Sequence, residues 1–273
     1  MSAPSDLTTL ANVKAWQGIT TTDSDPQISA LISASSRMIY SFLGRPSLLP
    51  RSWTDRYDGR VGQTRVLLRN WPVISVQSVQ AGVSSLSAVD PSRPTIGYAL
   101  APDPWGGAPP GAPQTLDLYG GAIADRQGLI VTYTAGHQDT FSGVVPSGGG
   151  TIVPSSAYGA WATDQGVVFT NTGAALALVS GTPAAGQYAV SATGTYTFAA
   201  ADQNAPVSIS FGFIPSELGQ ACVELVAQRL FAGSRVGVKS KSLGGQETVG
   251  YDTAGIPDAV KMMLQPYRKV VPL

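Results

Sequence analysis

Side chains able to perform acid–base or nucleophilic chemistry are few in this chain and widely spaced. His137 is the single histidine, and Asp139 lies two residues beyond it. A serine-type nucleophile needs a base within hydrogen-bonding reach and a third group that orients the base. Two residues at one strand end do not supply that arrangement, and the chain has no GxSxG motif. We interpret His137 as a structural or loop histidine.

Metal binding and paired-carboxylate catalysis have equally little support. One histidine and one cysteine, Cys222, cannot supply a zinc site with the usual ligands. Glu217 and Glu224 lie two turns apart on one expected helix, where an N-terminal dipole position and an exposed position explain them. Asp55 and Asp58 are interpreted as residues of a solvated turn. We therefore predict no catalytic, cofactor or metal site, and no enzymatic activity.

Two basic clusters remain as candidate binding residues. The first has interleaved aromatic residues, Trp53 and Tyr57, and its members are Arg45, Arg51, Arg56, Arg60, Arg65 and Arg69. The second consists of Arg235, Lys239 and Lys241. Arginine with aromatic residues suits either a single-stranded nucleic acid or a protein interface. Because strand alternation would divide these arginines between two faces, we favour an interface or solvated surface over direct nucleic-acid binding.

The composition indicates a β-rich protein with an unusually uncharged surface. Charged residues are 12% of the 273, about half the usual share of roughly 25%, and the formal net charge is zero. The protein as a whole therefore has no net positive electrostatic field that would attract nucleic acid or an anionic membrane. One cysteine allows no intrachain disulfide, and the N-terminus lacks the features of a signal peptide. We expect synthesis in the cytoplasm and no membrane span.

Helical patterns occur at both ends of the chain. The clearest runs from Asp25 to Leu43, with Pro26 in its first turn and Gly44 as its stop. A shorter helix is expected over 6–17, capped by Asp6 and with Trp16 facing inward. Further helices are expected over 215–233 and from residue 256 onward.

Strand patterns fill the middle of the chain. Alternating segments at 52–59, 65–69, 73–81, 94–102, 115–121 and 128–137 predict a first β-region. Short strands between 141 and 212 predict a separate β-sandwich-like module. We therefore expect an α+β fold: a helical bundle from both chain ends with a projecting β-region and an inserted small all-β module. Residues 1–140 and 213–273 would form the core, and residues 141–212 the insertion.

Several segments resemble the head–tail connector (adaptor) proteins of tailed bacteriophages. At the N-terminus, LTTLANVKAWQGI is followed by a polar turn and then by DPQISALISASSRMIYSFLGRP. Further along, a strand ends in YTAGH, the segment GVKSKSLGG follows the third helix, and GIPDAVKMMLQPYRKVV comes near the end. The resemblance covers 1–140 and 213–273, and residues 141–212 depart from it.

The resemblance implies a structural virion protein of the neck, made in the bacterial cytoplasm and without enzymatic activity or cofactor. About a dozen copies would form a ring between the portal and the tail, extend the DNA channel without sequence-specific binding, and provide a platform for a tail protein. The inserted module could contact the capsid. An alternative is a virion carbohydrate-binding, receptor-binding or decoration protein that uses the 141–212 module.

On this interpretation, the basic and aromatic residues divide into two candidate surfaces. The candidate channel or tail-facing residues are Arg51, Arg56 and Arg60. The candidate portal or subunit interface consists of Arg235, Lys239, Lys241, Tyr251, Tyr267, Arg268 and Lys269.

Overall fold

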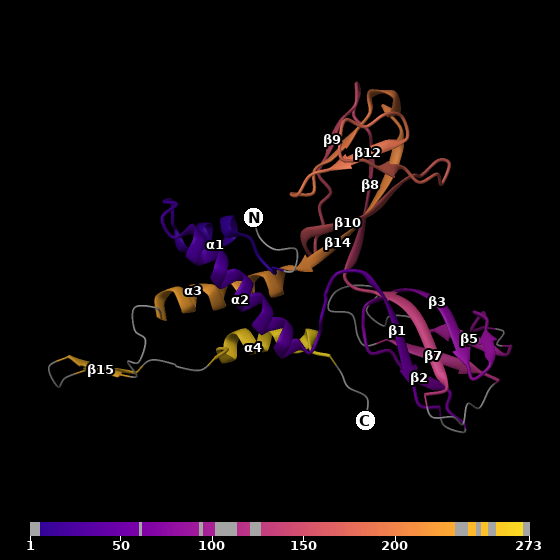
Figure 1. Ribbon diagram of the computed structural model, residues 1–273, viewed down its shortest axis with the longest axis horizontal. Coiled ribbons are helices and arrows are strands. Elements are labelled where there is room, and N and C mark those ends of the chain that lie inside the picture. The colour runs from indigo at the N-terminus through magenta and orange to yellow at the C-terminus, as the bar shows by residue number, and fades with distance from the viewer. Residues whose placement is uncertain are drawn as a thin grey trace. The chain divides into compact units, whose positions relative to one another are not determined.

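The computed structural model describes residues 6–59, 62–92, 95–101, 114–120, 127–232, 240–243, 247–250 and 255–269. The chain forms two compact units (Figure 1). The helical unit comprises Met1–Pro46 and Ser216–Arg268, and the β unit comprises Ser47–Pro215 with Lys269–Leu273. Each unit has its own buried side chains and is described separately.

Helices from the two ends of the chain pack together in the helical unit. They are α1 (Leu10–Gln17), α2 (Asp25–Leu43), α3 (Ser216–Ala232) and α4 (Asp258–Leu264), with a 3-10 turn at Gln265–Tyr267. α3 contacts each of the other three helices. This contact is possible because α3 buries residues around much of its circumference, including Leu218, Cys222, Val223 and Val226.

The predicted limits of α2 are confirmed. Pro26 lies in its first turn, and Gly44 adopts a left-handed conformation with φ of 66°. The backbone N–H of Gly44 donates to the carbonyl of Ser41, and that of Arg45 donates to Tyr40, which satisfies the last turn. The expected apolar stripe is buried along α2 at Ile28, Ile32, Ile39 and Leu43.

The prediction for the first helix is wrong at its start and on one face. α1 is capped by Thr9, whose hydroxyl accepts from the backbone N–H of Asn12 at 3.2 Å. Asp6 instead lies buried before the helix and accepts from the hydroxyl of Ser33 on α2. Trp16 was expected to face inward, but 57% of its surface is exposed because α1 buries only Val13.

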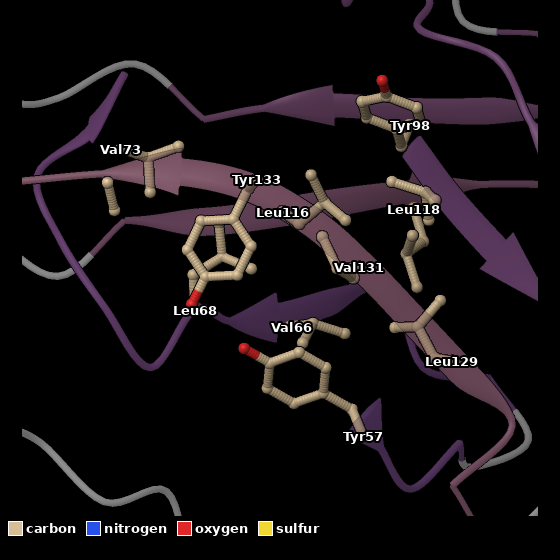
Figure 2. Close-up of a cluster of buried hydrophobic side chains, with 12 residues drawn as sticks. Tyr57, Val66, Leu68, Val73, Tyr98, Leu116, Leu118, Leu129, Val131 and Tyr133 are labelled. Carbon is tan, nitrogen blue, oxygen red and sulfur yellow. The ribbon is translucent and has the colours of Figure 1, made fainter. Parts of the chain in front are cut away.

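Sheets A and B enclose the first core of the β unit. Sheet A has the order β1 (Arg51–Tyr57), β7 (Leu129–Ala135), β3 (Val73–Ala81) and β4 (Ser84–Leu86). Sheet B has the order β2 (Arg65–Leu67), β6 (Thr115–Tyr119) and β5 (Gly97–Leu100). All neighbours in these two sheets are antiparallel. Figure 2 shows the apolar side chains of this core, including Val66, Leu116, Val131 and Tyr133.

Sheets C and D enclose a second core. Sheet C has the order β10 (Gly159–Phe169), β14 (Pro206–Pro215) and β8 (Gln138–Val144). Sheet D has the order β11 (Ala177–Leu178), β12 (Gln187–Val190), β13 (Tyr196–Phe198) and β9 (Gly150–Ile152). A 3-10 turn at Ala200–Asp202 precedes β14. Strand β8 was not predicted, because its sequence QDTFSGV contains few strong strand-forming residues.

The expected helical bundle is wrong as a fold class. The described residues form sixteen strands and only four α-helices, so the protein is mostly β-sheet. The last two strands, β15 (Ser240–Leu243) and β16 (Glu247–Gly250), pair as sheet E. The prediction gave weight to the strong helical periodicity at the chain ends, whereas the intervening sheets enclose two hydrophobic cores of their own. None of the described helices is both long and apolar enough to cross a membrane.

Candidate functional site

Tyr267 and Arg268, two residues of the C-terminal candidate interface, belong to the helical unit. Tyr267 is 1% exposed, and its hydroxyl donates to the carboxylate of Glu217 at 3.0 Å. Burial, reinforced by Glu217, raises the pKa of Tyr267. The guanidinium of Arg268 lies 5.6 Å from the ring centroid of Phe42, and Lys269 is half-buried. The last turn of the described chain is therefore held on α2 and α3.

Three of the four remaining members of that candidate interface lie outside the described residues. Arg235, Lys239 and Tyr251 lie outside the described residues, as does Arg60 of the other candidate surface. Lys241 lies in β15 and pairs with Val249 in sheet E. The interface role of these residues stays a prediction.

Most of the described arginines in the first basic cluster contact aromatic rings or a carboxylate of the same chain, or are buried. The guanidinium of Arg51 stacks 4.5 Å from the ring centroid of Trp53, and that of Arg69 lies 4.9 Å from Tyr57. Arg65 forms a 2.8 Å ion pair with Asp117, and Arg45 is buried.

Arg56 differs from the other described arginines of this cluster. It is exposed and makes none of the ring contacts or ion pairs that hold Arg51, Arg65 and Arg69. Arg51 and Arg56 also lie on opposite faces of β1, because they are five positions apart and successive side chains of a strand alternate between faces. The two candidate channel-facing arginines therefore do not form one patch.

The outer face of sheet A, which we call face A, is lined by hydroxyl groups. The strand register aligns Ser52 with Thr134 and Ser75, and Thr54 with Thr132 and Ser78. A third row contains Arg56, Ile130 and Gln80. All nine side chains are exposed or half-buried, and Arg56 is the one charged residue among them.

Hydrogen bonds order the side chains of face A before any partner binds. The hydroxyls of Thr54 and Thr132 lie 3.2 Å apart across the strand pair. The side-chain amide of Gln77, which lies at a register shift of β3, donates to the hydroxyl of Thr134. Face A is therefore a pre-ordered polar surface with little charge.

Sheet C has a similar outer face, which we call face C. Ser208 of β14 lies between Ser142 of β8 and Val168 of β10, and Ser210 pairs with Thr140. Val144 continues the same face and is 56% exposed. The inward-facing neighbours along β14, Val207, Ile209 and Phe211, are buried in the second core. The named residues of face C carry no charge.

Asp55 corrects one interpretation from the sequence. It is not a solvated turn residue, because it lies within β1 on the side of the sheet that faces the core. Its carboxylate accepts from the hydroxyls of Tyr133 at 2.6 Å and Tyr57 at 3.3 Å, and from the amide of Asn70 at 3.4 Å. The alternation Trp53-x-Asp55-x-Tyr57 could have revealed this, since residues two apart share one face of a strand.

A second carboxylate, that of Asp164, accepts hydrogen bonds from tyrosine hydroxyls between sheets C and D. Asp164 of β10 accepts from the hydroxyls of Tyr188 at 2.6 Å and Tyr196 at 2.8 Å. The indole N–H of Trp161 donates to Tyr196 at 3.2 Å. Burial, then the bond to Asp164, raises the pKa of Tyr188. Sequence reasoning missed this group because a bulge between Asp164 and Val167 breaks the strand alternation.

His137 has the environment of a structural residue. It is 1% exposed, its backbone N–H donates to Leu48 at 2.8 Å, and its carbonyl accepts from Phe213 at 3.2 Å. Its ring lies 5.6 Å from that of Phe213. Asp139 accepts instead from the backbone N–H of Thr140. Within the part of the chain that the structure describes, no group of three or more His, Cys, Asp or Glu residues could hold a metal ion.

Comparison with known proteins gives a family match for the first third of the chain. Residues 6–100 match the model of the head completion protein family. This range contains α1, α2 and strands β1 to β5. A comparison with curated proteins gives no match.

Among solved structures, the chain is similar to one in the neck of an empty GTA particle, computed with C6 symmetry. The identity is 14%, the alignment covers 100% of this chain and 95% of the other, and the TM-score is 0.36. Residues 6–100 are thus similar to the head completion protein family, and over this range the predicted resemblance to head–tail connectors is confirmed.

Proposed function

We propose that copies of this chain form a ring at the neck of a phage-like particle, between the portal and the tail. The ring extends the channel through which DNA passes and provides the platform to which a tail protein attaches. The match of residues 6–100 to the head completion family carries this proposal. The same family suggests a non-enzymatic role for the chain.

The surface chemistry supports an assembly protein. Faces A and C together contain one charged residue among the side chains named above, whereas exposed protein surfaces are commonly about one-quarter to one-third charged. Charge depletion is typical of the centre of a protein interface. Surface of this kind fits a subunit that is partly covered by neighbours in its working state.

We also propose that the C-terminal basic residues contact the portal or an adjacent subunit. Arg268 is exposed and is positioned by its stacking on Phe42 of α2. Stacking limits the conformations that the guanidinium adopts, which lowers the entropy lost when it binds a carboxylate.

The ring is tested with particles assembled in the presence and absence of the chain. We expect heads without tails to accumulate when the chain is missing, and the wild-type gene to restore tailed particles. Electron microscopy of the restored particles should show density for the chain between portal and tail. Normal tailed particles that lack the chain would overturn the proposal.

The C-terminal contact is tested by charge reversal. Arg268→Glu should weaken binding of the chain to portal-containing heads by roughly tenfold, since it replaces an attractive charge with a repulsive one. Arg37→Glu is the matched control, because Arg37 is also exposed but lies in the middle of α2. Equal binding by the two variants would show that Arg268 does not contact the portal.

A further inference from the structure

Two consecutive residues near the end of the described chain are attached to two different helices. Tyr267 donates a hydrogen bond to Glu217 of α3, and Arg268 lies over the ring of Phe42 on α2. We propose that the bond from Tyr267 to Glu217 is a positioning contact, which holds the guanidinium of Arg268 in place for a carboxylate of the portal. This inference rests on the proposed C-terminal contact and adds the residues that orient it.

Apolar packing holds α4 in the helical unit but does not by itself fix the residues that follow it. Val260 and Leu264 are buried along α4, and the ring of Tyr267 is buried in the 3-10 turn after it. Apolar burial is non-directional, whereas a hydrogen bond requires a narrow range of distance and angle. The 3.0 Å bond from Tyr267 to Glu217 therefore fixes this turn relative to α3.

The bond joins a carboxylate to a phenol that stays protonated. Glu217 lies in the first turn of α3, where the helix dipole stabilises a negatively charged side chain. Burial, then the bond to Glu217, raises the pKa of Tyr267, so the hydroxyl remains a donor. A hydrogen bond to an ionised acceptor is stronger than one between neutral groups.

Arg268 follows directly, and its backbone is also held. Its N–H donates to the carbonyl of Gln265 at 3.2 Å, which closes the 3-10 turn. Its guanidinium is exposed and forms no ion pair with a carboxylate of the described residues. A planar guanidinium held in one orientation suits a bidentate bond to a carboxylate, and it loses less entropy on binding.

A double-mutant cycle on binding to portal-containing heads tests whether Tyr267 acts through Arg268. Tyr267→Phe keeps the buried ring but removes the hydrogen bond, and it should weaken binding by about threefold. Arg268→Ala should weaken binding by about fivefold. The double variant should bind like Arg268→Ala alone, because no guanidinium remains to be positioned. Multiplied losses of about fifteenfold in the double variant would overturn the inference, as would normal binding by Tyr267→Phe.

A buried tyrosine of the β unit separates positioning from a general loss of stability. Tyr188 is 2% exposed and donates to Asp164 at 2.6 Å, so Tyr188→Phe removes a comparable bond to a carboxylate. This variant should bind heads within about twofold of wild type, while urea denaturation measures the stability that each tyrosine variant loses. Equal weakening of binding by Tyr188→Phe and Tyr267→Phe would contradict a positioning role for Tyr267.

Substitutions of Glu217 test the acceptor. Glu217→Gln keeps a side-chain oxygen that can accept from Tyr267, and it should bind within about twofold of wild type. Glu217→Ala removes the acceptor and should weaken binding by about threefold, as Tyr267→Phe does. Equal losses for the two Glu217 variants would mean that the negative charge itself serves binding, which would overturn the inference.

These outcomes separate the inference from the proposed function. Normal binding by both Arg268→Ala and Arg268→Glu would remove the proposed portal contact, and the inference with it. Weakened binding by the Arg268 variants, but not by Tyr267→Phe or Glu217→Ala, would overturn the inference alone.

Discussion

The phenol of Tyr133 on β7 donates a 2.6 Å hydrogen bond to the carboxylate of Asp55 on β1, 78 residues earlier in the chain. The same hydroxyl accepts from the backbone N–H of Asn70 at 3.1 Å. These two bonds join the neighbouring strands β1 and β7 to the segment that follows β2. Because Tyr133 and Asn70 are buried, the network positions sheets A and B around their shared core.

Removal of the Asp55 carboxylate should destabilise the protein. Asp55→Ala leaves the buried hydroxyl of Tyr133 and the amide of Asn70 without this acceptor. We expect a loss of about 1–3 kcal/mol in the free energy of unfolding, measured by urea denaturation. Tyr119→Phe is the control: Tyr119 is half-buried and has no comparable network, so it should change stability by less than about 0.5 kcal/mol. Equal effects would show that the Asp55 network adds nothing.

Alkaline pH should destabilise the protein through buried tyrosines. Burial raises the pKa of Tyr57 from 10.0 to about 12, although its hydrogen bond from the backbone N–H of Arg69 acts in the opposite direction. The folded state favours the neutral phenol, so this stabilisation is complete below pH 10 and is lost as the pH rises to about 12. Urea denaturation across that range measures the slope. Tyr57→Phe should make the slope shallower, and an unchanged slope would exclude Tyr57 as a contributor.

Gly136 should tolerate no side chain. Its φ is 148°, and a Cβ atom there would lie 2.4 Å from the backbone of Leu49 and Pro50. Gly136→Ala should cost roughly 3 kcal/mol or more, because backbone atoms cannot yield as a flexible side chain can. Gly18→Ala is the matched comparison: φ is 68° but nothing lies within 4 Å, so only the backbone strain of about 1 kcal/mol applies. Thermal denaturation of both variants tests this difference.

α4 offers a pair of apolar residues that separate packing from surface effects. Leu264 is fully buried, whereas Met262 is 77% exposed. Leu264→Ala should destabilise the protein by about 2–5 kcal/mol through the lost contacts and the cavity left behind. Met262→Ala should change the unfolding free energy by less than about 0.5 kcal/mol. Similar losses for both variants would mean that α4 does not dock as described.

Cys222 should be chemically inert in the folded protein. Burial raises the pKa of its thiol from 9.0 to about 11, and Ser36 lies 3.5 Å from its sulfur. The reactive thiolate is therefore rare at neutral pH. Iodoacetamide should label Cys222 in urea but not under native conditions, as followed by mass spectrometry. Rapid labelling of the native protein would show that the α2–α3 contact opens readily.

Local sequence signals located individual elements well. Pro26 and Gly44 mark the limits of α2, and the predicted strand over 73–81 coincides with β3. These signals depend on residues a few positions apart, so they remain valid in any tertiary context. They did not reveal β8, which forms because β14 pairs along its full length. They also led to an overestimate of the helical content of the whole fold.

The sequence by itself determined the low charge, the helices at the chain ends and the resemblance to head–tail connectors. Only the tertiary structure decided which serines and threonines share a face and which arginines contact aromatic rings or carboxylates. It also decided that Asp55 accepts hydrogen bonds in a buried network. The physical reason is strand register. Thr54 and Thr132 become neighbours through backbone pairing between residues 78 positions apart, and no periodicity within either strand specifies that alignment.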